Sequence, residues 1–429
     1  MLTTLKNAFK IKEIRQKILF TLGMLVVIRI GSQLPVPGVD TKFFSQWFAQ
    51  QTGGAFSFFD AITGGSFLNM SILALNINPY ITSSIIMQLL TIAIPKLEEM
   101  QRDGEDGRKK MVAITRYVTI ALALIQSTAM AIGFGRQGYL IEFNALNVIT
   151  AITALTAGSA FLMWVGERIT EKGIGNGISM VIMAGIVGRM PQQFSSAWSS
   201  LISGESAPSY GAWLFAAYIL IYLLIIIFVT LINTAERRIP IQYTSSSISL
   251  SKPSEANYLP LKVNSASVIP VIFASSLMMA PIQIASFFPS NDFIKEMQKW
   301  LGLKTWYSLV IYVLLILFFT FFYTKMQINP EKVAENLGKS GSYIPSVRPG
   351  SETKDYINRV LSRITVLGSV ALAFIAVMPH VMPLIWPDLP SSMALGGTGM
   401  IIVVGVAIET VRQVQGLITQ KSYKKYYED

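Results

Sequence analysis

The sequence predicts an all-α membrane protein: ten transmembrane helices in two inverted five-helix halves, with a re-entrant helix between the first two spans. Of the 429 residues, 52% are hydrophobic and only 14% are charged, with a mean hydropathy of +0.49. Soluble domains carry about 25% charged residues, so this chain lacks the charge that coats a water-facing surface. Two further observations support the prediction. Apolar stretches of membrane-spanning length recur ten times, and the basic residues gather in alternate connections between them.

A bilayer core of about 30 Å requires about 20 mostly apolar residues per helix. The sixth stretch, with YLLIIIFV at its centre, is the clearest of the ten, whereas the fifth is short and rich in glycine. No cleavable signal peptide is expected, because the chain starts with a polar, basic segment and the following apolar run is too long. The predicted spans are 18–36, 76–95, 112–134, 147–166, 176–191, 212–233, 266–288, 307–327, 364–386 and 395–414.

Charge asymmetry predicts the orientation of these spans. Ten is an even number, so both termini lie on the same side of the membrane. That side carries 28 of the 35 Lys and Arg residues, the opposite connections carry six, and Arg29 falls inside the first span. Because Lys and Arg are enriched in cytoplasmic loops, both termini are predicted to be cytoplasmic.

The connection between the first two spans is long and apolar, and contains FSFFDAITGGSFLNMSILAL. Asp60, Asn69 and the Gly64-Gly65 pair interrupt it, so it is a poor full span. We expect a half-helix that dips back into the protein, since non-helical backbone at membrane depth survives only inside protein or a wet cavity. A surface amphipathic helix is the alternative.

Five spans precede the middle of the chain and five follow it, which predicts an N-terminal half of residues 1–191 and a C-terminal half of residues 192–429. An odd number of spans per half forces opposite topology, as inverted repeats require. The C-terminal half carries two long cytoplasmic loops, 236–262 and 325–363, which are too large to be mere connectors.

Composition excludes most catalytic chemistry. The chain has no cysteine and one histidine, which removes disulfides, thiolate nucleophiles and Cys/His metal sites. Gly338-Lys339-Ser340 is not a P-loop, because that motif needs a glycine where the chain has Val333. We therefore predict no catalytic site, no cofactor and no metal, with energy supplied by a partner or a gradient. Arg29 is interpreted as a structural residue that pairs with a carbonyl or a carboxylate.

Four spans contain glycine or proline breaks, and isoleucines follow each break closely. The breaks are Asn76–Pro79, Gly173–Gly177, Pro270 and Gly396–Gly399. Pro270 is expected to free a backbone carbonyl and weaken the seventh helix. An apolar constriction between breakable helices blocks ions by dewetting and still parts for something large. The alternative is ordinary helix packing with isoleucine as filler.

Seven sequence strings resemble the SecY family, the central subunits of bacterial Sec protein translocases, and they follow the family's order from the first span to the last. The resemblance implies a channel with a central pore that passes unfolded secretory chains across the membrane and releases transmembrane segments sideways into lipid. The strings are LPVPGVD (34–40), NPYITSSIIMQLL (78–90), GIGNGIS (173–179), AERRIPIQY (235–243), LPLKVNSASVIPVIFASS (259–276), NPEKVAENLGKSGSYIPSVRPG (329–350) and GGTGMIIVVGVAIETVRQVQ (396–415).

The resemblance also implies roles for individual residues. The re-entrant helix becomes a plug at about residues 56–70, and a lateral gate lies between spans two and three on one side and seven and eight on the other. The implied pore ring is Ile77, Ile81, Ile182, Ile186, Ile272 and Ile402; the implied plug residues are Phe56, Phe58, Phe59, Ile62, Gly64, Gly65 and Phe67; the implied polar gate residues are Ser83, Ser84, Gln126, Ser275 and Ser276.

The partners implied by the resemblance are the small membrane subunits SecE and SecG, the motor ATPase SecA, the ribosome, signal sequences and nascent secretory chains, and the lipid of the cytoplasmic membrane. Arg237, Arg238 and Arg348 are the implied docking residues of the cytoplasmic loops. The tip of loop 236–262 has a single lysine where relatives are often basic, which weakens any docking to ribosomal RNA through charge at that tip.

Two alternatives come from other functional classes. An ion-coupled secondary transporter with inverted repeats predicts buried charges at mid-membrane, which are scarce here. A passive structural membrane subunit leaves the broken helices unexplained.

Overall fold

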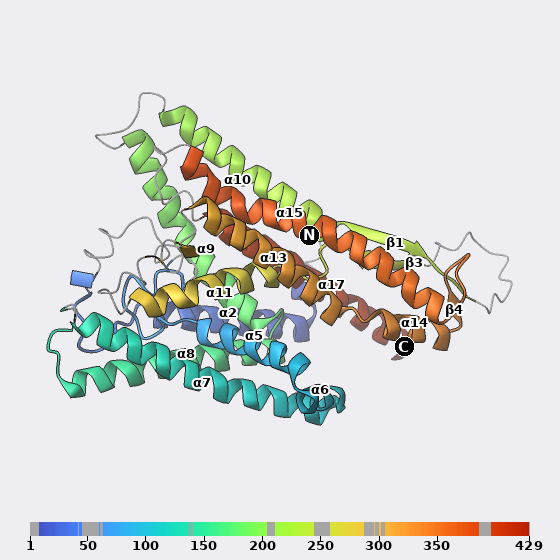
Figure 1. Cartoon of the computed structure of the whole chain (residues 1–429), viewed down its shortest axis with the longest axis horizontal. Coiled ribbons are helices and arrows are strands. Elements are labelled where there is room, and N and C mark those ends of the chain that lie inside the picture. The colour runs from blue at the N-terminus through green and yellow to red at the C-terminus, as the bar shows by residue number, and fades with distance from the viewer. Residues whose placement is uncertain are drawn as a thin grey trace.

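The computed structural model is almost entirely helical (Figure 1). Its long helices run roughly side by side, with the first half of the chain along one side of the bundle and the second half along the other. The structure describes residues 8–41, 43–44, 60, 63–136, 138, 140–203, 211–243, 258–286, 296, 300–301, 305–385 and 396–428.

A helix overlaps each of the ten predicted spans, and the count of ten membrane crossings stays a prediction. Among the described residues, six of these helices (α7, α8, α10, α13, α15 and α17) are long and apolar enough to cross a membrane by themselves, and α5 forms a pair with α6 (Pro95–Arg102) that bends by 107°. The chain is therefore a multi-pass membrane protein. The helices are α2 (Lys12–Gly31), α5 (Asn78–Ala93), α7 (Gly104–Arg136), α8 (Ala145–Lys172), α9 (Gly177–Trp198), α10 (Gly211–Thr234), α11 (Ile269–Ser286), α13 (Trp306–Gln327), α15 (Ser351–Ile385) and α17 (Gly396–Glu428).

Local sequence explains where several helices begin. Pro79 lies in the first turn of α5, where a missing N–H leaves no helical hydrogen bond unmade. Asn176 caps α9, because its side-chain oxygen accepts the amides of Ile178 and Ser179. The expectation for Pro270 is wrong: α11 begins at Ile269, so this proline also lies in a first turn and breaks no helix.

The fifth span is longer than predicted. α9 continues through Pro191 to Trp198 and is followed by a π-helical turn, Ser199–Ser203. The border between the halves drawn at residue 191 thus lies inside a helix, and the division into inverted halves stays a prediction.

The two long loops of the C-terminal half fold together. Strands β1 (Glu236–Pro240) and β3 (Tyr258–Lys262) form an antiparallel hairpin, and β2 (Gln242–Tyr243) pairs with β4 (Ser342–Tyr343), which follows helix α14 (Pro330–Lys339). We call these strands, α14 and the first turns of α15 the hairpin module. It lies at one end of the bundle, beyond the long helices (Figure 1), and its own apolar core contains Ile239, Leu261, Leu337, Ile344 and Ile357.

The hairpin module also explains why α15 starts earlier than predicted. The ninth span was expected to begin at residue 364, but the helix already begins at Ser351. Ile357 and Leu361 are buried, and Ile357 belongs to the module's apolar core. Tertiary packing thus extends the helix beyond its purely apolar stretch.

The two halves meet along two lines of contact. On one line α17 packs against α9 and α2; on the other α11 packs against α5 and α7. The largest apolar cluster of the described residues lies between these lines and draws side chains from both halves. This junction holds the candidate site.

Candidate functional site

The six isoleucines of the implied pore ring lie on four helices that meet at the junction of the halves. The first half contributes Ile77 and Ile81 at the start of α5 and a second pair, Ile182 and Ile186, on α9. In both pairs the spacing of four residues places the side chains on one helix face. The second half contributes Ile272 from α11 and Ile402 from α17.

All six side chains belong to one apolar cluster. Ile272 is partly buried, and the other five are at most 6% exposed: Ile77, Ile81, Ile182, Ile186 and Ile402. Gly399, one turn before Ile402, lies directly against Ile186, because a Cβ at Gly399 would come within 2.8 Å of its Cγ2 atom. The six isoleucines thus lie in or against the same large apolar cluster, while their role as a pore ring stays a prediction.

The described part of the implied plug, residues 60 and 63–70, consists of turns rather than a regular helix beyond residue 63. Gly64 and Gly65 have φ values of +69° and +88°, a left-handed conformation that favours glycine. Gly64 touches α9 so closely that an added Cβ would come within 2.6 Å of the Cα atom of Gly185. Phe56, Phe58, Phe59 and Ile62 lie outside the described residues.

Phe67 packs this segment against two further aromatic rings. Its ring contacts Phe44 edge-on, with centroids 5.6 Å apart, and lies 6.2 Å from the ring of Phe134 at the end of α7. The segment's last residues lie against α8, where the hydroxyl of Ser159 donates to the carbonyl of Asn76 at 3.1 Å. The segment is therefore packed into the protein, as expected for a re-entrant element and not for a surface helix.

Three charged side chains hold the same segment in place: Arg29 and Arg189 from neighbouring helices, and Asp60 of the segment itself. Arg29 of α2 donates to the carbonyl of Gly64 at 3.0 Å, which confirms the prediction that this arginine pairs with a carbonyl or a carboxylate. Asp60 forms an ion pair with Arg189 of α9 at 2.5 Å and also accepts the amide of Leu68 at 2.8 Å. The pairing of Asp60 with Arg189 was missed. Its signal in the sequence was a lone aspartate in an apolar segment, because a charge at such depth requires a partner.

The implied lateral gate lies between α5 and α7 on one side and α11 and α13 on the other. Ser83 donates to the carbonyl of Thr115 at 2.9 Å, which joins α5 to α7 within one side of the gate. Ser84 accepts from Gln88 at 3.2 Å within α5, and Ser275 donates to the carbonyl of Ile272 within α11.

The remaining two gate residues, Ser276 and Gln126, are both half-buried. Ser276 lies in α11. Gln126 lies in α7, and in the described part of the chain its buried Oε1 atom has no hydrogen-bond partner. Of the five implied gate residues, Gln126 is thus the one whose polar group the described structure leaves unsatisfied.

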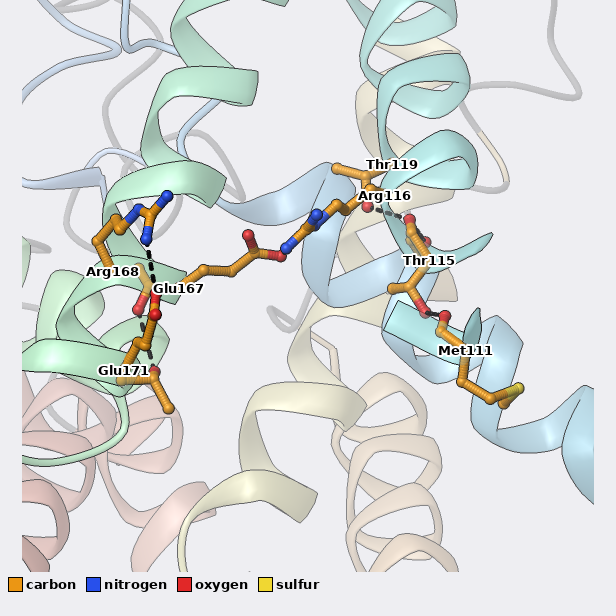
Figure 2. Close-up of polar contacts among 10 residues, drawn as sticks. Met111, Thr115, Arg116, Thr119, Glu167, Arg168 and Glu171 are labelled. Carbon is orange, nitrogen blue, oxygen red and sulfur yellow. Dashed lines mark hydrogen bonds and ion pairs between the residues drawn. The ribbon is translucent and has the colours of Figure 1, made fainter. Parts of the chain in front are cut away.

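Figure 2 shows how polar contacts fasten α7 to its neighbour α8. Arg116 of α7 forms an ion pair with Glu167 of α8 at 2.8 Å. Two further bonds lie within α7. The hydroxyl of Thr115 donates to the carbonyl of Met111, and the hydroxyl of Thr119 donates to the carbonyl of Thr115. The Arg116–Glu167 ion pair and the Ser83 bond thus connect α5, α7 and α8.

A cavity of about 710 Å³ opens where this side faces the other half. Its walls come mostly from α5 and α7, and Met326 of α13 and Lys332 of α14 complete it. The wall combines polar side chains such as Gln88 with the three methionines Met87, Met111 and Met326. Unbranched methionine side chains adapt to differently shaped apolar partners.

The three implied docking arginines are exposed on the hairpin module. Arg237 and Arg238 lie on β1, and Arg348 lies between β4 and α15. The guanidinium of Arg238 stacks over the ring of Tyr258, 4.6 Å from its centroid, and its hydrogen bond to Glu236 raises its pKa. These contacts orient Arg238 on the hairpin module.

Comparison with known proteins identifies the family. A sequence model of the SecY family matches residues 71–411. The chain belongs to the SecY family. The protein translocase subunit SecY of Staphylococcus carnosus (strain TM300) is 42% identical over 431 residues, which cover 99% of each chain. That of Staphylococcus aureus (strain NCTC 8325 / PS 47) is 41% identical with the same coverage.

Solved structures of SecY and Sec61 channels have the same fold. A structure of a protein-conducting channel superposes with a TM-score of 0.65 at 18% identity and covers 94% of this chain and 92% of that one. Sec61 in a canine ribosome–channel complex from the endoplasmic reticulum gives a TM-score of 0.64, with the same identity and coverage.

Membership of the SecY family settles the class of function. The chain is a protein-conducting channel subunit of a translocase, as predicted, and the alternative of an ion-coupled secondary transporter is not supported. By family it is a channel subunit and not an enzyme.

Proposed function

We propose that unfolded polypeptides cross the membrane through the six isoleucines at the junction of the halves, and that these side chains seal the channel when it is idle. The supporting observation is their common cluster, drawn from α5, α9, α11 and α17. A collar of branched apolar side chains offers water and ions no polar partner, so it excludes them by dewetting. The collar parts for a polypeptide because no covalent or hydrogen-bonded link closes it.

Transmembrane segments leave sideways between α5/α7 and α11/α13. A signal sequence is an apolar helix, and it replaces the contacts of α11 with α5 and α7 by its own. It opens this gate only to the extent that it binds the parted state more tightly than the closed state. The methionine-lined cavity between the halves suits this role, because its walls adapt to signals of different sequence.

Partners dock on the hairpin module, on the cytoplasmic side. The excess of Lys and Arg in alternate connections supports cytoplasmic termini and a cytoplasmic module in the cell's inner membrane. We assign Arg237, Arg238 and Arg348 to contacts with the ribosome and the motor ATPase SecA. The small subunits SecE and SecG complete the channel in the bilayer.

Single-cysteine cross-linking tests the route directly, because the chain has no cysteine of its own. In the assembled translocase, Ile402→Cys and Ile81→Cys should cross-link to a stalled translocation intermediate. The control is Phe374→Cys, whose parent side chain is 62% exposed on the outside of the bundle and should face lipid. Equal cross-linking at Phe374 and Ile402 would overturn the proposed route.

A further inference from the structure

A cluster of three charged residues joins three separate segments just beyond the isoleucine collar. Arg29 on α2 and Arg189 on α9 converge on the re-entrant segment, which contributes Asp60. The side chain of Asp60 is 2% exposed and that of Arg189 is 19% exposed. Asp60 uses one carboxylate oxygen for Arg189 and the other for the amide of Leu68, so it also fixes the fold of the segment itself.

The cluster has a defined place relative to the collar. Arg189 follows Ile186 by three residues on α9, so the ion pair lies one turn beyond the last isoleucine of this helix. On the same stretch of α9, Gly185 makes the close contact with Gly64, and a side chain at Gly188 would overlap the guanidinium of Arg29. Two glycines on one face of α9 thus leave the space in which the segment and Arg29 fit.

Departure of the segment from this position would break both of its polar contacts with the neighbouring helices at once. Asp60 would lose Arg189, and Arg29 would lose the Gly64 carbonyl. Removing one partner from a buried ion pair is strongly unfavourable, because it leaves a charge without compensation. The contacts therefore resist displacement until water or another polar group replaces them.

The partners of the segment also come from one half only. Arg29 and Arg189 both belong to the first half, on α2 and α9, whereas the proposed lateral gate parts between α5/α7 and α11/α13. Parting of the gate therefore leaves the ion pair intact. Release of the segment is a separate step with its own resistance.

We infer that Arg29, Asp60 and Arg189 form a latch that holds the re-entrant segment against the isoleucine collar and sets how strong a signal must be to open the channel. The inference rests on the proposed function, because a latch matters only if the collar is the route. The three are positioning residues: they act on the segment and not on the translocated chain.

The test uses the complete translocase in vesicles and in cells. Asp60→Asn keeps the size of the side chain and removes its charge, and Arg189→Gln removes the other charge. Each should raise the ion flux of the idle channel about tenfold, the lower end of what a charge-assisted hydrogen bond contributes. Each should also restore export of a precursor with a defective signal sequence, while export of the normal precursor continues. The double variant should leak no more than the leakier single variant, because the two residues act as one pair.

Two further variants guard the interpretation. Asp40→Asn alters an exposed aspartate of the same connection, whose carboxylate accepts the nearby Phe43 amide, and should leave flux unchanged. Arg29→Gln removes the hydrogen bond to the Gly64 carbonyl. It replaces either charge variant that fails to accumulate in the membrane, and it should raise the idle ion flux as well. Unchanged flux and signal requirement in the latch variants, or fully multiplicative effects in the double variant, would overturn the latch. Neither result would change the expected cross-linking at Ile402, so failure of the latch is distinguishable from failure of the proposed route.

Discussion

Gly399 of α17 lies directly against Ile186 of α9, and this contact fixes how closely the two halves approach at the collar. A Cβ at Gly399 would come within 2.8 Å of Ile186 Cγ2, a distance that real side chains do not tolerate. Gly399→Ala should therefore displace Ile186 or push α17 outward, and idle ion flux should rise. Gly416→Ala on the same helix is the matched control, because nothing lies within 4 Å of its added Cβ. Equal flux in the two variants would contradict this role for Gly399.

The seal of the idle channel should depend on the polarity of the side chain at position 402 more than on its size. Its side chain is 3% exposed in the apolar cluster, so an amide there leaves polar atoms without partners at a cost of about 1–3 kcal/mol to the closed state. Ile402→Asn is expected to admit water, raise idle ion flux and allow export of precursors with defective signals. Ile402→Val keeps an apolar side chain and should retain the seal. An asparagine variant with unchanged signal stringency would count against the collar.

Reversal of charge at Arg348 should block docking without harming the channel. Arg348 is exposed, and two hydrogen bonds hold its backbone: its amide donates to Glu352, and its carbonyl accepts from Thr353. Arg348→Glu is expected to reduce precursor export sharply while the protein still accumulates in the membrane. Arg359→Glu makes the same change at an exposed arginine of α15 and controls for net charge. Normal export in Arg348→Glu would refute its docking role.

The sequence predicted the positions of the spans well because their signal is physical and local: about 20 consecutive apolar residues match the thickness of the bilayer core. Asn176 and Pro79 likewise mark helix starts that the structure has. Pro270 was misjudged, because a proline one residue into a helix and a proline inside one look alike until the start of the helix is known. A lone aspartate in an apolar segment signals that Asp60 needs a partner. That the partner is Arg189 was out of reach, since the pair joins residues far apart in the chain through the packing of a re-entrant segment on α9.

The gate residues show the same limit of sequence-based prediction. The family resemblance named five polar side chains, but not which of them have hydrogen-bond partners. Ser83 is fully buried and satisfied by the Thr115 carbonyl, which makes it a fastener between α5 and α7. The Oε1 atom of Gln126 is buried without a partner among the described residues, so the arrangement with α11 packed against α5 and α7 carries the cost of that buried oxygen. Replacing such a group with an apolar one of similar size is neutral or stabilising.

Gln126→Leu should therefore favour the closed gate by about 1 kcal/mol and slow the export of precursors with weakly apolar signals, with little effect on strong ones. Ser83→Ala is the matched variant at a gate position. It should lower the thermal stability of the purified complex, since it removes a buried hydrogen bond, without changing the ranking of signals. The measurement is the export rate across a series of signals of graded hydrophobicity. A steeper dependence in Ser83→Ala than in Gln126→Leu would show that fastening within one side of the gate, and not the unsatisfied amide, governs its opening.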